Sequence, residues 1–226
     1  MPGGGAVCVS GAVEGLLDEA VLKRLISHVG ALTGPVYGRA GKAQLLRRLQ
    51  GYNQAAQFGP WVVLLDLDLD ADCAPPYRAA HLPHPAPQMC FRIAVREVEA
   101  WLFADRERLA RFLAVSEGTI PVHPEMVQSP KDTMAQLAQR SRRRDVREDV
   151  APRPGSGRRV GPAYSSRLIQ FVDDAAQGWR PDVAASASNS LARCLRCLRH
   201  LTIHGSQRSA RSSQLLAVSF HLATKG

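Results

Sequence analysis

The sequence has no long apolar run: nowhere does it approach the roughly 20 consecutive apolar residues that a membrane-spanning helix needs. Its first residues also lack the positively charged segment and the apolar stretch that together make a secretory signal peptide. These two absences argue against a membrane protein and against a secreted one. We therefore expect no membrane partner and a cytoplasmic location.

Cysteine is scarce and odd in number, with five residues in a chain of 226. A small secreted scaffold would need cysteines in pairs, so we expect no disulfide framework. Cys194 and Cys197 form one CxxC motif, but no second pair and no nearby histidine completes a tetrahedral zinc set. Their spacing within an amphipathic pattern indicates core packing in a helix, and we expect no structural zinc.

Acidic residues are absent after Asp182, which changes how the net charge of +9 should be interpreted. Six basic residues follow Asp182, so residues 1–182 carry a net charge of only +3. Lysine is also rare, with 4 residues against 25 arginines in an alanine-rich chain, an imbalance that GC-rich coding can produce. The charge permits a nucleic-acid partner without indicating one.

The first half of the chain alternates apolar runs with segments of helical periodicity. Four apolar runs predict strands, at 6–13, 36–37, 61–65 and 91–95. Helical spacing of apolar residues predicts three helices, at 16–29, 43–57 and 99–113. The run at 61–65 is continuous, as in a parallel strand that is covered on both faces. This alternation predicts an α/β fold with a mostly parallel sheet.

Prolines and arginines interrupt the pattern elsewhere. The segment 71–88, rich in proline and alanine, predicts a long loop. Three further helices are expected, at 131–140, 164–177 and 187–201. The serine-rich stretch from 202 onward is expected to be poorly ordered. The predicted organisation is an α/β domain at 1–115, a helical appendage of the same unit at 116–201, and a tail at 202–226.

Acidic residues follow two of the predicted strands. Asp66, Asp68 and Asp70 come at the end of the most buried strand, and their spacing of two predicts that they converge on one face, with the leucines on the other. Glu14 ends the first strand. Because the carboxyl ends of parallel strands meet at one edge, we expect Glu14 to face Asp66 and Asp68. Such carboxylates repel one another unless a cation is present, and hard oxygen ligands suit Mg²⁺ or Mn²⁺.

These motifs admit other interpretations. A solvated acidic loop is as well supported by the aspartate run alone. An EF-hand is excluded, because the required Gly and Glu are missing at the sixth and twelfth positions from either Asp66 or Asp68. The segment Gly38–Lys42 lacks the first glycine and the final Ser/Thr of a Walker loop. A turn that starts a helix is favoured there, although Lys42 could still meet a phosphate.

Taken together, these segments resemble the Toprim fold of topoisomerases, primases and overcoming-lysogenization-defect nucleases. The matching pieces are Val13–Glu19 and Leu65–Asp68. The chain is also similar to an uncharacterised bacterial Toprim-like family over roughly residues 6–201. The motifs that carry this second resemblance are Gly41-Lys42, Leu65–Asp68, Arg92–Leu102, Pro130-Lys131, Val160–Tyr164 and Ser190–Leu195.

The resemblance implies roles for the acidic residues. Glu14 would act in acid/base chemistry or in holding metal, and Asp66 and Asp68 would bind Mg²⁺ or Mn²⁺. Nuclease-type members use an additional carboxylate, for which Glu99 is the candidate and Glu97 the second choice. The alternative for Glu99 is a residue in the first turn of a helix that complements the helix dipole.

Lys131 resembles the basic residue that holds a phosphate in such enzymes, and a solvated surface lysine is the alternative. The implied function is a Mg²⁺-dependent nuclease that acts on DNA or RNA. Relatives of this kind often accompany an ATPase in phage-defence or toxin-like systems, which implies an ATPase partner. A non-catalytic metal-binding interaction module is the second hypothesis, and a primase-type nucleotidyl transferase is the third.

Overall fold

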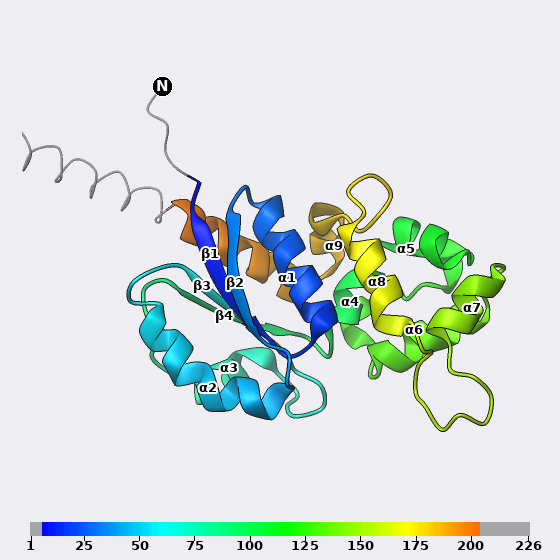
Figure 1. Cartoon of the computed structure of the whole chain (residues 1–226), viewed down its shortest axis with the longest axis horizontal. Coiled ribbons are helices and arrows are strands. Elements are labelled where there is room, and N and C mark those ends of the chain that lie inside the picture. Colours follow the sequence, from blue (N-terminus) through cyan, green and yellow to red (C-terminus); the bar gives the residue numbers. More distant parts are fainter. Residues whose placement is uncertain (1–5, 204–226) are drawn as a thin grey trace, which may run out of the picture.

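The computed structural model describes residues 6–203 of the chain, and its centre is a four-stranded sheet (Figure 1). The strands are β1 (Cys8–Val13), β2 (Leu32–Gly38), β3 (Trp61–Asp66) and β4 (Met89–Ala94). They pair in the order β2-β1-β3-β4, and every pairing is parallel. The predicted α/β fold with a mostly parallel sheet is confirmed.

Helices connect the strands and then form the second half of the described chain. They are α1 (Leu16–His28), α2 (Lys42–Ala55), α3 (Ala74–His81), α4 (Val98–Phe103), α5 (Arg106–Leu113), α6 (Pro130–Gln139), α7 (Arg144–Val150), α8 (Tyr164–Asp173) and α9 (Pro181–Ala187). Two short 3-10 turns lie at η1 (Glu117–Thr119) and η2 (Pro124–Met126). A last helix runs from 189 to 203, where the described residues end, and we call it the C-terminal helix.

The sheet is covered on both faces, as the continuous apolar run of β3 predicts. Val62 and Leu64 of β3 belong to one core with α1 and the C-terminal helix. Val63 and Leu65 belong to another with α2 and α3. Successive side chains of a strand point to opposite faces, so the four residues Val62–Leu65 are all buried, and Trp61 is partly buried. Figure 1 shows α1 on one side of the sheet and α2 with α3 on the other.

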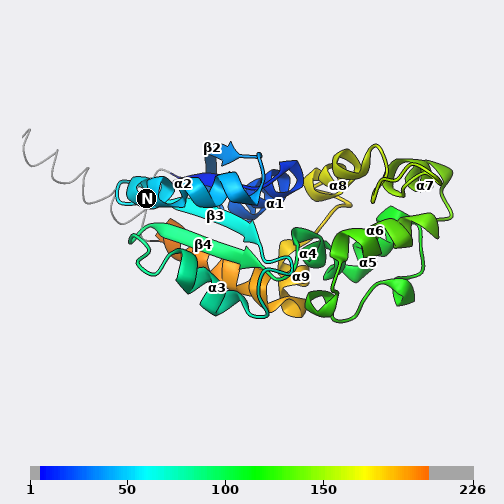
Figure 2. The ribbon, with the colours of Figure 1, turned by 90° about the horizontal axis from the view of Figure 1, so that it is seen from below.

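The helical half lies beyond the carboxyl ends of the strands. Figure 2 shows β4 pointing toward α4, with α5, α6, α7 and α8 farther along the molecule and the C-terminal helix returning beneath β4. The core on the α1 face is continuous with this half, because it also contains Met134 of α6, Val150 of α7 and Leu168 of α8. The edge of the sheet where the acidic residues were predicted therefore faces the helices from 98 to 187.

Four differences from the predicted elements have local causes. The predicted loop at 71–88 contains α3, whose prolines Pro75 and Pro76 occupy the first turn, where a missing N–H costs little. Likewise α7 lies in the arginine-rich segment 140–163, and α9 begins on Pro181. The helix predicted at 99–113 is divided into α4 and α5 at Asp105. The carboxylate of Asp105 is fully buried and accepts hydrogen bonds from the backbone and side chain of Arg180.

The expectation for the cysteines is wrong for one pair. Cys90 of β4 and Cys197 of the C-terminal helix form a disulfide, with their Cα atoms 6.0 Å apart. Cys194 is free and fully buried, as expected of a core position. Counting cysteines could not reveal this pair, because the two residues are 107 positions apart and only the fold brings them together.

The predicted tail at 202–226 lies almost entirely outside the described residues. Within residues 6–203, no helix has both the length and the apolar character required to cross a membrane.

Candidate metal-dependent site

Glu14 and Asp66 meet at the carboxyl ends of two neighbouring strands. Glu14 directly follows β1, and Asp66 is the last residue of β3. The backbone N–H of Asp66 donates a hydrogen bond to Glu14 Oε1 at 2.7 Å. The expected adjacency of the two acidic residues is therefore observed, whereas their chemical role remains a prediction.

A backbone hydrogen bond holds the Asp66 side chain toward α4. Asp66 Oδ1 accepts a hydrogen bond from the backbone N–H of Val98, at 3.0 Å. Burial raises the pKa of Asp66 well above its usual range, and repulsion from Asp18, Glu99 and Glu14 raises it further. Asp66 is thus the point at which acidic groups from β1, α1 and α4 influence one another.

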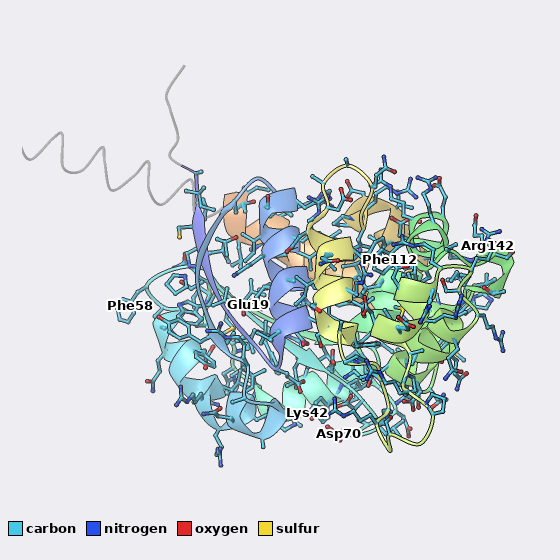
Figure 3. All side chains as sticks on the ribbon, turned by 45° about the vertical axis from the view of Figure 1, so that its right-hand side comes forward. Glu19, Lys42, Phe58, Asp70, Phe112 and Arg142 are labelled. Atoms are coloured by element: carbon cyan, nitrogen blue, oxygen red, sulfur yellow. A yellow bond between two sulfur atoms is a disulfide. The ribbon has the colours of Figure 1, made fainter. Side chains whose placement is uncertain are left out.

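Asp68 and Asp70 are not on the strand, which corrects the predicted alternation. β3 ends at Asp66, and Asp68 lies in a turn with a φ of +51°. Lys42 Nζ lies 2.5 Å from Asp68 Oδ2 and 2.7 Å from Asp70 Oδ2, a proximity visible for Lys42 and Asp70 in Figure 3. The hydrogen bond from Lys42 lowers the pKa of Asp70. In this arrangement Asp70 pairs with Lys42 and Tyr77 rather than with Glu14 or Asp66.

Lys42 is brought to the acidic edge by a close approach of two strand ends. Gly38 has a φ of +96°, and a Cβ there would lie 2.1 Å from the carbonyl oxygen of Val13. The loop then continues to Gly41, whose N–H donates to the carbonyl oxygen of Glu14 at 3.1 Å. Burial alone would lower the pKa of Lys42, but its hydrogen bonds to Asp68 and Asp70 raise it. Lys42 is therefore a charged ammonium group within the site.

Asp18 is a member of the site that the sequence reasoning missed. It lies in the first turn of α1, one helical turn beyond Glu14, and only 7% of it is exposed. Its Oδ1 is buried and has no hydrogen-bond partner among the described residues. Burial raises the pKa of Asp18, and Asp68 contributes in the same direction. The spacing of four residues after a strand-end glutamate is the signal that could have identified it.

Glu99 and Glu97 approach the same edge from the start of α4. Glu99 is 2% exposed, and its Oε1 accepts a hydrogen bond from the hydroxyl of Tyr164 at 3.0 Å. Burial raises the pKa of Glu99 to about 7, against the opposing effect of Lys131. Glu97 Oε2 accepts the backbone N–H of Lys131 at 2.7 Å. Glu99 is thus inside the cluster, and Glu97 fixes the start of α6.

Lys131 lies within reach of the acidic cluster and is not a solvated surface residue alone. Its Nζ is 3.9 Å from Glu99 Oε1, and its side chain is 40% exposed. Burial would lower the pKa of Lys131, but Glu99, Glu97 and Asp66 outweigh burial and raise it. An ammonium group that is partly open to solvent beside buried carboxylates has the chemistry needed to meet a phosphate.

The carboxylates of the site repel one another. Burial raises the pKa of Glu14 to about 7, and repulsion from Asp18 and Asp68 contributes. Buried carboxylates with raised pKa values and an unpartnered Asp18 Oδ1 are a donor set that suits Mg²⁺ or Mn²⁺. In the side-chain positions of the described chain, however, no three His, Cys, Asp or Glu residues converge into a preformed metal-binding group. Asp68 is instead held by Lys42, so metal binding would require Lys42 to move away from it.

Comparison of the chain with models of protein families, with curated proteins and with solved structures found no match. The resemblance to the Toprim fold therefore stays a prediction.

Proposed function

We propose that this chain is a Toprim-like, metal-dependent phosphodiesterase that cleaves nucleic acid. The observation that supports the proposal best is the cluster of Glu14, Asp18, Asp66 and Glu99 at the carboxyl edge of the sheet, in which Asp18 and Glu99 are buried and the other two partly buried. Concentrating carboxylates in a partly buried position costs folding free energy, and a protein recovers that cost when a divalent cation binds.

The charge and burial of each residue suggest which of them would bind the cation. Asp66, Asp18 and Glu14 would hold the cation, with Asp68 joining them when Lys42 releases it. A bound Mg²⁺ or Mn²⁺ supplies Lewis acidity toward a phosphate oxygen and a water of lowered pKa. Asp70 remains paired with Lys42 and is a poorer candidate for a ligand.

The remaining residues of the site would act on protons and on the phosphate. Lys131, which is partly exposed beside Glu99, would pair with the phosphate of the substrate. Glu99, with a pKa of about 7, is suited to exchange a proton near neutral pH. Tyr164 donates to Glu99 and would keep its carboxyl group oriented.

The deciding experiment incubates the purified chain with DNA and RNA in single-stranded, duplex and supercoiled forms, with Mg²⁺ or Mn²⁺. Asp66→Asn keeps the size of the side chain and removes its charge. Asp173→Asn is the matched control, because Asp173 is an exposed aspartate at the end of α8. We expect metal-dependent cleavage that falls at least a hundredfold in Asp66→Asn and is unchanged in Asp173→Asn. Equal cleavage by wild type and Asp66→Asn would contradict the proposal.

One observation favours the second function, a non-catalytic metal-binding interaction module. Lys42 already neutralises Asp68 and Asp70, as a structural ion pair would. Calorimetric titration with Mg²⁺ and Mn²⁺ separates the two functions when it is paired with the cleavage assay. Tight metal binding that Asp66→Asn abolishes, without cleavage of any DNA or RNA, would support the module.

The cellular setting is proposed on the resemblance alone. An ATPase partner and a role in phage defence are carried over from Toprim-like relatives of this kind. Co-purification of the tagged chain from its own cells would test for the ATPase.

A further inference from the structure

A second charged site adjoins the loop that carries Asp68 and Asp70. It is a pocket of about 330 Å³ between α3, the end of β4, η2 and the C-terminal helix. Arg96 fixes this loop, because its Nη1 donates to the carbonyl oxygen of Asp68 at 2.8 Å and lies 3.4 Å from that of Ala71. Asp72, at the end of the loop, already lines the pocket.

Three arginines from three different elements line this pocket. They are Arg78 of α3, Arg92 of β4 and Arg193 of the C-terminal helix. Arg92 is the unusual member, because it interrupts a buried strand and its Nε is buried without a hydrogen-bond partner among the described residues. Burial lowers the pKa of Arg92, and the positive charges of Arg78 and Arg193 lower it further. A guanidinium group stays charged in proteins, so it can be satisfied only by an acceptor or an anion.

The acidic residues of the pocket do not satisfy Arg92. Glu125 lines the pocket, but its Oε1 accepts hydrogen bonds from the Ser188 hydroxyl and from the Ser190 N–H, each at 2.7 Å. Asp72 is exposed at the rim. Three arginines against two carboxylates leave one net positive charge in the lining. The lining is therefore short of negative charge, and a polyphosphate, which carries more negative charge than a monoester, would meet repulsion from Asp72 and Glu125.

We propose that this pocket binds the phosphate monoester of a nucleotide, either a free nucleoside monophosphate or the phosphorylated end of a nucleic-acid strand. Arginine forks match the oxygens of a phosphate group better than any other side chain does. The pocket is larger than a phosphate needs, and Pro75, Ile93 and Val95 add apolar walls on which a sugar and base can pack. The exposed carboxylate of Asp72 can accept a hydrogen bond from a sugar hydroxyl.

Calorimetric titration of the full chain tests this site separately from the acidic one. The titrations use EDTA, so that no divalent cation bridges a phosphate to the carboxylates. The probes are inorganic phosphate, adenosine monophosphate, adenosine triphosphate, and one oligonucleotide with and without a 5′-phosphate. We expect the monophosphate to bind more tightly than the triphosphate. A preference for the phosphorylated oligonucleotide would identify the strand end as the source, and a preference for the free nucleotide would identify the small molecule.

Matched arginine variants decide whether the pocket is the binding site. Arg92→Gln and Arg193→Gln should each weaken binding roughly tenfold to a hundredfold, because each removes a charge-assisted hydrogen bond. Arg142→Gln is the control, since Arg142 is exposed at the far end of the helical half (Figure 3). Arg193 is exposed on its helix, so this variant tests the pocket even if Arg92→Gln folds poorly.

Asp66→Asn should bind the monophosphate as wild type does, which keeps this inference independent of the proposed nuclease activity. Failure of every probe to bind wild type, or equal binding by wild type, Arg92→Gln and Arg193→Gln, would overturn the proposal.

Discussion

The acidic edge and the arginine pocket both include residues of the loop that follows β3, and in each site charges of one sign outnumber those of the other. Repulsion among the carboxylates of the acidic edge is reduced within the protein itself. Lys42 pairs with Asp68 and Asp70, Lys131 lies 3.9 Å from Glu99, and carboxylates can take up protons. The charge of Arg92 in the arginine pocket is not relieved in this way, because its Nε has no hydrogen-bond partner among the described residues and a guanidinium group does not release its proton. The acidic edge therefore tolerates the absence of its ligand better than the pocket does.

This difference predicts that the two sites respond differently to pH. Carboxyl groups of the acidic edge titrate near neutral pH, whereas arginines stay charged over the whole accessible range. The stability of the ligand-free protein should thus depend on pH through the carboxyl groups of the acidic edge. The arginine pocket should change the stability of the protein only when an anion is added.

The largest expected effect concerns Glu99. Its pKa of about 7 in the folded chain exceeds the value of 4.5 expected when the chain is unfolded, so the folded state binds the proton more tightly. The contribution of Glu99 to the free energy of unfolding is therefore complete below about pH 4.5, and it is lost as the pH rises through about 7. The full loss is about 3 kcal/mol in the free energy of unfolding.

Urea unfolding of wild type and Glu99→Gln in EDTA at pH 5 and pH 8 measures this effect. Glutamine keeps an acceptor for the Tyr164 hydroxyl and removes the charge. The variant should be more stable than wild type at pH 8 and similar at pH 5. Equal pH dependence in the two proteins would show that Glu99 is not the titrating group.

Replacement of Lys42 should have the next largest effect. Lys42→Met removes both ion pairs and leaves Asp68 and Asp70 without a counter-charge, at a cost of about 1–2 kcal/mol at pH 8 in EDTA. Added Mg²⁺ should restore more stability to Lys42→Met than to wild type, because the cation then meets no competitor at Asp68. Thermal unfolding with and without Mg²⁺ gives both quantities, and Lys23→Met, on exposed Lys23 of α1, is the control. If Mg²⁺ stabilises wild type and Lys42→Met by the same amount, Lys42 does not compete with the cation for Asp68.

The fold could be predicted from the sequence mainly where burial controls the pattern. The strand at 61–65 is apolar throughout because both of its faces are covered, and this signal is independent of distant contacts. The helix α3 was missed because the prolines of the segment 71–88 suggested a loop, although proline is well accommodated in a first turn. The Cys90–Cys197 disulfide depends on a contact that local patterns do not contain.

The candidate site could be predicted only in part, for a similar reason. The adjacency of Glu14 and Asp66 follows from parallel strands that end at one edge. The position of Asp68 does not follow, because the strand stops one residue after Leu65 and the chain turns. The arginine pocket had one visible sign, a charged Arg92 within the apolar run 91–95. A charged residue at such a position predicts a functional or paired group more often than a defect.

The smallest effect we predict completes the comparison between the two sites. Arg92→Met removes a guanidinium group whose Nε is buried without a partner, so ligand-free protein should gain about 1 kcal/mol in its free energy of unfolding. The same variant should lose the stabilisation that adenosine monophosphate gives to wild type. Urea unfolding in phosphate-free buffer at pH 7, with and without the nucleotide, measures both. Arg142→Met should change neither quantity. A loss of stability in Arg92→Met without nucleotide would mean that Arg92 has partners inside the protein and that its pocket needs no anion.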